Sequence, residues 1–374
     1  MKFHYVRIRI LHLVVLAALT IFGASGALGQ EAQSSRAMRE PGAGLLFYAK
    51  GDYAYNTDAI ANPYITGGFF QIIWSEIEKE NGKYDWTEVD KWVTPWIDAG
   101  KYVTLRVMWS TSGYWNFDYY KHPTPKWVFD EGAKYAYHEP SQTEIPLPWD
   151  PVYRKYAERF LEEINRKYGA DPHVLFIDVT PGAETNPYRF GTINRRNPEF
   201  QGEYLQTKAS DGRPYDADMW METVKDYIDM SDRIFPNTPL LVTLNVAGMP
   251  EAGTRLPLVG DYCAARGFYV GQNGLGGRSY PDPESAMKYH EWAMTSKVFF
   301  EMVAGTGERT GTLMEVMKAA ERAHCSYLNV YPEDVLRGTK GQANFSQEYE
   351  DALKYGAETL MPANTSSATN GRSR

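Results

Sequence analysis

The chain has 374 residues, and 43% of them are hydrophobic, so it can bury a large core in one domain or in two. Its 47 acidic and 39 basic residues give a net charge of −8, which argues against nucleic acid and anionic membrane surfaces as partners. No cluster of His, Asp and Glu has metal-ligand spacing, so the sequence predicts neither a metal nor another cofactor.

The first 29 residues have the pattern of an export signal. Lys2, Arg7 and Arg9 precede an apolar run at 10–23, and small residues follow as far as Gly29. Cleavage there leaves a secreted or periplasmic protein without a membrane segment. A retained anchor is the alternative, but the apolar run is short for a spanning helix.

A polar linker is expected at 30–43, and eight short apolar runs then alternate with amphipathic segments. The expected strands are 44–49, 67–74, 101–109, 173–180, 239–246, 267–272, 297–303 and 325–331. The expected helices are 86–99, 151–168, 216–235, 255–265, 284–295 and 311–324, a closing helix at 346–359, and a weaker one at 57–64.

This alternation predicts an α/β fold, a single (βα)8 barrel over 44–360. A doubly wound open sheet is the competing fold, but no Gly-x-Gly-x-x-Gly turn follows the first strand, which disfavours a dinucleotide fold. The polar tail at 361–374 is expected to be disordered.

Segments that lead from strand to helix are long, and those that lead from helix to strand are short. In a (βα)8 barrel the long loops gather at the C-terminal face, where the chemistry of this fold takes place. The longest, 110–148, is dense in aromatic residues, which indicates a binding cleft beside some packing of the loop on itself. Its histidines, His122 and His138, are expected to be ordinary surface residues.

Two cysteines, Cys263 and Cys325, are compatible with two states. In an exported protein they can form a disulfide, and two buried free thiols are about as frequent. Their spacing matches no metal-binding motif.

Two glutamates stand where strands four and seven end. Glu184 follows the apolar run 174–177, and Glu301 lies within the apolar run 297–305. Glycoside hydrolysis needs such a pair, one carboxylic acid to protonate the leaving oxygen and one carboxylate at the sugar carbon. A buried salt bridge with Arg106 is the alternative role for either glutamate.

The segment from Trp74 to Trp86, which ends in Gly-Lys-Tyr-Asp-Trp, resembles a motif of the clan A glycoside hydrolases. These are retaining (βα)8 enzymes that include cellulases and family 42 β-galactosidases, and the resemblance covers roughly residues 44–360. It implies Glu184 as general acid/base and Glu301 as nucleophile. Where the clan has an asparagine before the acid/base, this chain has Ala183, which marks a divergent member.

The remaining site candidates follow from their positions. Arg106 is expected to keep Glu301 ionised, while the pKa of Glu184 is raised. Tyr269 is expected to donate to the nucleophile or to fill the barrel interior. The predicted substrate-binding residues are Arg106, Trp74, Trp109, Trp115, Asn186, Asn245, Tyr269, Gln272 and Tyr331, of which the tryptophans are expected to stack on sugar faces.

The sequence therefore predicts a secreted retaining glycoside hydrolase that cleaves β-glycosidic bonds of a polysaccharide or oligosaccharide. The alternative is a barrel that binds carbohydrate without cleaving it. An exported metal-dependent hydrolase is disfavoured because the ligands are missing. The clan geometry implies that the carboxylate oxygens of Glu184 and Glu301 lie roughly 5–5.5 Å apart.

Overall fold

The computed structural model describes Arg39 and residues 41–110, 122–138, 142–182, 217–244, 252–277 and 283–360. The expected signal at 1–29 and tail at 361–374 lie outside the described residues. Four predicted site residues also lie outside them: Trp115, Glu184, Asn186 and Asn245.

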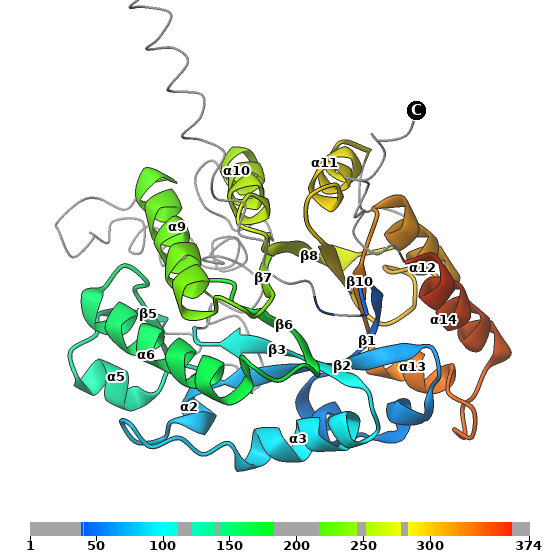
Figure 1. Ribbon diagram of the computed structural model, residues 1–374, viewed down its shortest axis with the longest axis horizontal. Coiled ribbons are helices and arrows are strands. Elements are labelled where there is room, and N and C mark those ends of the chain that lie inside the picture. Colours follow the sequence, from blue (N-terminus) through cyan, green and yellow to red (C-terminus); the bar gives the residue numbers. More distant parts are fainter. Residues whose placement is uncertain are drawn as a thin grey trace, which may run out of the picture. The chain divides into compact units, whose positions relative to one another are not determined.

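Eight parallel strands form a closed barrel, so the predicted (βα)8 fold is confirmed and the open sheet is excluded (Figure 1). Around the barrel the order is β1, β2, β3, β6, β7, β8, β9, β10 and back to β1. The strands are β1 Gly44–Ala49, β2 Ile65–Ile73, β3 Tyr102–Met108, β6 Val174–Asp178, β7 Leu240–Thr243, β8 Tyr269–Leu275, β9 Val298–Met302 and β10 Tyr327–Val330.

Helices surround the barrel where the sequence predicted them. The longer ones are α3 Thr87–Asp98, α6 Pro151–Tyr168, α9 Ala217–Ile234, α10 Ala252–Ala264, α11 Pro283–Ala293, α12 Leu313–Arg322 and α14 Gln347–Thr359. Shorter ones are α2 Trp74–Ile77, α5 Lys126–Asp130 and α13 Pro332–Arg337, and a hairpin is formed by β4 Tyr135–His138 and β5 Thr143–Pro146. In place of the weak helix at 57–64 there are two 3-10 helices, η1 Gly51–Tyr55 and η2 Asp58–Ala61.

Local sequence explains where two of these helices begin. Asp150 accepts hydrogen bonds from the backbone of Val152 and Tyr153, and proline occupies the first position of α6. Thr312 and Glu315 form a reciprocal capping box at the start of α12. Each cap satisfies backbone N–H groups that the helix itself leaves unpaired.

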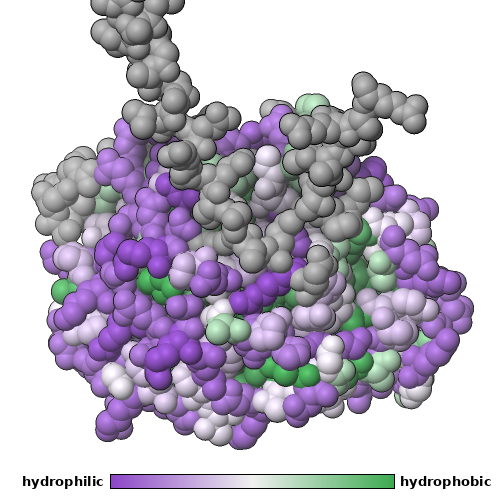
Figure 2. All heavy atoms as spheres, viewed as in Figure 1, coloured by the Kyte–Doolittle hydropathy of each residue, from purple (hydrophilic) through white to green (hydrophobic). Residues whose placement is uncertain are grey.

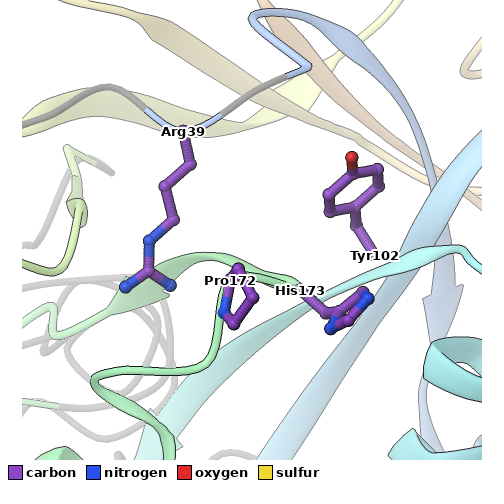
Figure 3. A pocket seen from close by; sticks show the side chains of 4 residues that line it. All are labelled: Arg39, Tyr102, Pro172 and His173. Carbon is purple, nitrogen blue, oxygen red and sulfur yellow. The ribbon is translucent and has the colours of Figure 1, made fainter.

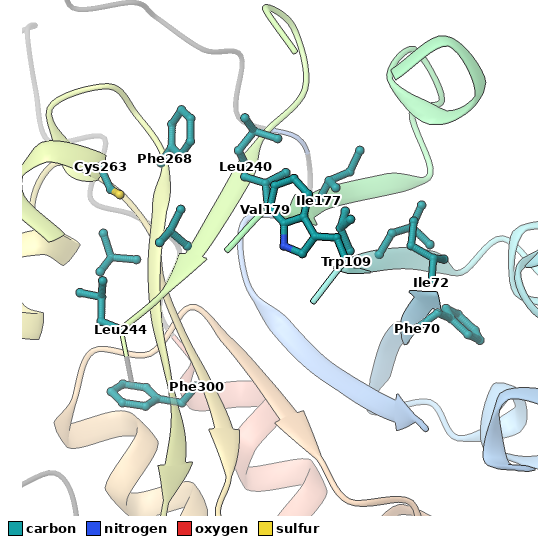
Figure 4. Packing of buried hydrophobic residues seen from close by; sticks show 14 of the residues in the cluster. Phe70, Ile72, Trp109, Ile177, Val179, Leu240, Leu244, Cys263, Phe268 and Phe300 are labelled. Carbon is teal, nitrogen blue, oxygen red and sulfur yellow. The ribbon is translucent and has the colours of Figure 1, made fainter. Parts of the chain in front are cut away.

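The strands bury both of their faces in two separate layers. The inner layer fills the barrel and is rich in aromatic residues: Leu46, Tyr48, Phe69, Leu175, Phe176, Leu241, Tyr269, Phe299 and Tyr327. The outer layer packs between the strands and the helices, and Figure 4 shows part of it around Trp109, Ile177 and Phe300. Because side chains alternate along a strand, the face of each strand residue identifies its layer.

The N-terminal end of the barrel is closed by the end of the predicted linker. Lys297 Nζ donates to the carbonyl oxygen of Gly42 at 2.8 Å, and the Tyr327 hydroxyl donates to that of Pro41 at 2.5 Å. Arg39 donates to the carbonyl oxygen of Gly169 at 2.6 Å and lines a small pocket there (Figure 3). Pro172, His173 and Tyr102 complete that pocket, which lies at the end of the barrel away from Glu301.

Cys263 and Cys325 are both buried free thiols, so the disulfide alternative is wrong. Burial raises the pKa of each thiol above its ordinary value, so both are held in the neutral form.

The face seen in Figure 2 is mostly hydrophilic, with hydrophobic residues in small separate areas. Across the residues that the structure describes, no helix has the length and apolar character to cross a membrane.

Candidate active site

Glu301 stands inside the barrel near its C-terminal mouth. On β9, Phe299 belongs to the inner layer and Phe300 to the outer layer, so alternation turns Glu301 inward, above Phe299. Its neighbours in register are Asn329 on β10 and Asn273 on β8. Only 4% of the residue is exposed, so its carboxylate depends on protein partners for stabilisation.

Arg106 on β3 joins this carboxylate to a second one. Its Nη1 donates to Glu301 Oε2 at 3.0 Å and its Nε donates to Asp178 Oδ2 at 2.8 Å. The guanidinium carbon lies 4.5 Å from the ring centroid of Phe69, which supports the cation from below. Asn329 Nδ2 also donates to Glu301 Oε2, at 3.1 Å. We refer to Arg106, Asp178, Glu301 and Asn329 as the Arg106 cluster.

The two carboxylates of the cluster differ in how many of their oxygens accept hydrogen bonds. Asp178 is fully buried, and its Oδ1 accepts from the hydroxyl of Thr180 at 2.6 Å and from the backbone N–H of Thr180 at 3.1 Å. Both of its oxygens are therefore occupied. The two bonds to Glu301 both end on Oε2, so Oε1 has no hydrogen-bond partner among the described residues. Glu301 is the carboxylate with an oxygen left for an incoming group.

Burial raises the pKa of Glu301, and the charges of Arg106 and Lys50 with the Asn329 hydrogen bond counteract only part of that rise. The contact that the sequence predicted between Arg106 and Glu301 exists. Arg106 lowers the pKa of Glu301, which is the direction that the sequence predicts for it, but the effect of burial is larger. Ionisation of Glu301 at neutral pH stays a prediction. Arg106 is also paired with Asp178, so its single charge stabilises two buried carboxylates.

The prediction that Trp74 and Trp109 stack on sugar faces is wrong. The Trp74 ring is fully buried, lies parallel to Phe160 of α6 at 5.2 Å, and donates through Nε1 to Glu78 Oε2 at 2.8 Å. Trp109 is also fully buried, and its Nε1 donates to the carbonyl oxygen of Thr180 at 3.0 Å. Because both rings are enclosed in the outer layer, neither has a face open to a sugar.

Of the two polar candidates on β8, Tyr269 takes one of its predicted roles and Gln272 faces away from the site. Tyr269 is the first residue of the strand and fills the inner layer beside Tyr327, so its second predicted role, barrel filler, is the observed one. Gln272 accepts a hydrogen bond from the Tyr289 hydroxyl of α11 and so faces the helices. A shift of one position along a strand reverses the face, and Asn273 occupies the position beside Glu301 instead.

Tyr331 lies just after β10, half-buried, with its ring 5.6 Å from that of Tyr48. Gln71 Nε2 donates to the Tyr48 hydroxyl at 3.1 Å, which adds another polar contact at this level of the barrel. Sequence reasoning missed Asn329 and Tyr48 as site residues. The available signal for Asn329 was a polar residue two positions after the inward-facing Tyr327 in an otherwise apolar strand.

Within the described ranges, no group of three or more His, Cys, Asp or Glu side chains is placed to hold a metal ion. His122 is exposed, as an ordinary surface histidine is. The described part of the site consists of a carboxylate held by a guanidinium and an amide.

A closed barrel of parallel strands with a charged cluster at its C-terminal mouth has the arrangement that (βα)8 enzymes use. Residues 66–231 match the Glyco_hydro_42 family model, described as β-galactosidase. The resemblance to family 42 glycoside hydrolases indicated by the sequence motif is confirmed over this stretch, which contains Arg106 and Asp178. No curated protein matches the chain.

Three solved β-galactosidases share this fold. The enzyme from the psychrophilic Marinomonas ef1 matches with a TM-score of 0.52 and 12% identity over 84% of this chain and 59% of its own. The β-galactosidase from the Antarctic haloarchaeon Halorubrum lacusprofundi matches with a TM-score of 0.52 and 13% identity, over 84% of this chain and 57% of its own. The β-galactosidase from Rahnella sp. R3 matches with a TM-score of 0.51 and 11% identity, over 87% of this chain and 57% of its own. The chain thus spans less than two thirds of each enzyme. The solved structures support the (βα)8 fold, and the family model relates residues 66–231 to β-galactosidases.

Proposed function

We propose that this protein is an exported retaining glycoside hydrolase that cleaves β-glycosidic bonds of a polysaccharide or oligosaccharide, with Glu301 as nucleophile and Glu184 as general acid/base. The observation that carries the proposal is the asymmetry of Glu301, whose Oε2 is fixed by Arg106 and Asn329 while Oε1 has no bonded partner in the described chain. A nucleophile needs this combination, because fixing one oxygen aligns the other with the sugar carbon.

The reaction takes two steps. Glu301 Oε1 attacks the anomeric carbon as the bond to the leaving oxygen breaks, and Glu184 gives that oxygen its proton. Glu184 then removes a proton from water, whose oxygen attacks the anomeric carbon and releases Glu301 as a carboxylate. Arg106 balances the charge that Glu301 regains at the end of the second step.

The alternative role of Glu301, a purely structural ion pair, predicts a different arrangement. Asp178 shows that arrangement, with both oxygens bonded and no exposure. A residue that served only to neutralise Arg106 would gain stability from bonding both oxygens, since buried polar groups are costly when unpaired.

Stereochemistry tests the proposal. The purified protein is mixed with aryl β-glycosides, and NMR follows the anomeric proton of the first-formed product. We expect the β-anomer to appear first, because two successive displacements retain configuration. First appearance of the α-anomer would contradict the two-step mechanism. Sugar binding without release from any aryl glycoside or polysaccharide would instead favour the non-catalytic carbohydrate-binding barrel.

A further inference from the structure

Lys50 places a positive charge at the mouth of the barrel. Along β1, Leu46 and Tyr48 belong to the inner layer, and side chains alternate in an extended strand. Lys50 follows the last strand residue and is still extended, with φ −90° and ψ 146°. The chain turns only at Gly51, whose φ is +53°. Lys50 is therefore the next residue of the inward-facing row, at the C-terminal end of the barrel.

Two tyrosine rings hold this lysine. Its Nζ lies 4.0 Å from the ring centroid of Tyr331 and 5.2 Å from that of Tyr48. Throughout the part of the chain that the structure describes, the side chain of Lys50 forms neither an ion pair nor a hydrogen bond, although the residue is half-buried. Ring faces stabilise a cation only modestly, so its ammonium keeps the capacity to bind an anion.

Lys50 also acts on the same site as the Arg106 cluster. Burial raises the pKa of Glu301, and the charge of Lys50 is among those that act against this rise. The strands that carry the two sites are also neighbours. Leu46 of β1, the strand that ends just before Lys50, lies opposite Asn329 of β10, and Asn329 donates a hydrogen bond to Glu301. Arg106 is already paired with two carboxylates. Lys50 is thus a cation at this mouth that forms no ion pair with a carboxylate of the described residues.

We propose that Lys50 binds an anionic group, a carboxylate or a sulfate, on the sugar that reacts with Glu301, so that the substrate is an acidic glycan. The inference rests on the proposed glycosidase function and specifies its substrate class. A charge-assisted hydrogen bond from an ammonium is stronger than one between neutral groups, so it selects for an anionic sugar over its neutral counterpart. A neutral sugar leaves the ammonium with ring contacts alone.

The test compares matched substrates on the wild type and on Lys50→Met. The probes are 4-nitrophenyl β-glycosides of the gluco and galacto series, each as the neutral sugar, the uronide and the 6-sulfate. We expect the wild type to prefer one anionic form, and Lys50→Met to lose about 10- to 100-fold in kcat/KM on that form while changing little on the neutral sugar. The anionic form on which Lys50→Met loses kcat/KM, the uronide or the 6-sulfate, identifies the anion that Lys50 binds.

The matched control is Lys155→Met. Lys155 also lies over a tyrosine ring, at 4.9 Å from the centroid of Tyr156, but it is exposed on α6. The Lys155→Met variant should keep the wild-type kcat/KM on every substrate. A wild type that prefers neutral sugars, or a Lys50→Met variant that loses as much on the neutral sugar as on the anionic one, overturns the inference. The second result would assign Lys50 to charge balance at Glu301.

Failure of the proposed function gives a separate result. If the wild type cleaves none of these substrates, calorimetry compares the binding of hexuronate and sulfated oligosaccharides to the wild type and to Lys50→Met. Weaker binding by the variant supports the lysine site without catalysis. Equal binding, or none, overturns it.

Discussion

Glu301→Gln is expected to lower kcat/KM on any cleaved glycoside by more than about 10⁴-fold, because the amide cannot attack the anomeric carbon. Glutamine keeps the size of the side chain and an oxygen that can accept from Arg106 and Asn329. The fold should therefore survive, and substrate should still bind. The measurement is steady-state kinetics of the purified variant beside its thermal unfolding curve.

The control for this variant is Glu350→Gln. Glu350 is about as buried as Glu301, and it pairs with Lys340 at 2.8 Å, but it lies on the outer helix α14. It should keep wild-type kinetics. Activity within about 10-fold of wild type in Glu301→Gln would show that this carboxylate is not the nucleophile.

Arg106→Met is expected to lower the free energy of unfolding by about 3–5 kcal/mol near neutral pH, because it leaves two buried carboxylates without their cation. Urea unfolding measures the loss. Arg154→Met is the control. Arg154 also contacts two carboxylates, Glu158 and Asp226, but about a third of its side chain is exposed, so its removal should cost about 1 kcal/mol or less.

The loss in Arg106→Met should depend on pH. Burial raises the pKa of Glu301 in the folded protein, so its contribution to stability is present below the unfolded pKa and lost as the pH rises through the folded pKa. Removing Arg106 raises the folded pKa further. The deficit relative to wild type should therefore be smallest near pH 4 and grow toward pH 8. A deficit that is equal at both pH values would show that Arg106 does not stabilise the charged form of Glu301.

The barrel could be predicted because its signal is local and repeated. Each buried strand is a short apolar run, and each helix has an apolar stripe, so the eight units were recognisable one at a time. Glu301 was recognisable for the same reason, as a charge inside an apolar strand. The sequence also predicts Arg106 as its partner, and the structure confirms this contact.

The predictions that were wrong concern which face of a strand a residue occupies and which elements pack against it. An apolar run in the sequence does not determine either. Trp74 and Trp109 stand at strand ends, but helices α6 and α9 cover them. Gln272 and Asn273 are adjacent in sequence, and only the register with β9 separates the helix-facing residue from the one beside Glu301. The sharing of Arg106 between Asp178 and Glu301 likewise depends on three strands that are far apart in the sequence.

Covalent trapping tests the central claim most directly. A 2-deoxy-2-fluoro glycoside with a good leaving group slows the second step more than the first, so a retaining enzyme accumulates its glycosyl-enzyme. Proteolysis and mass spectrometry then locate the added sugar mass. The structure predicts one label, on Glu301 in the peptide that contains β9. A label on another carboxylate, or rapid turnover with no label and an inverted product, would contradict the assignment of Glu301 as nucleophile.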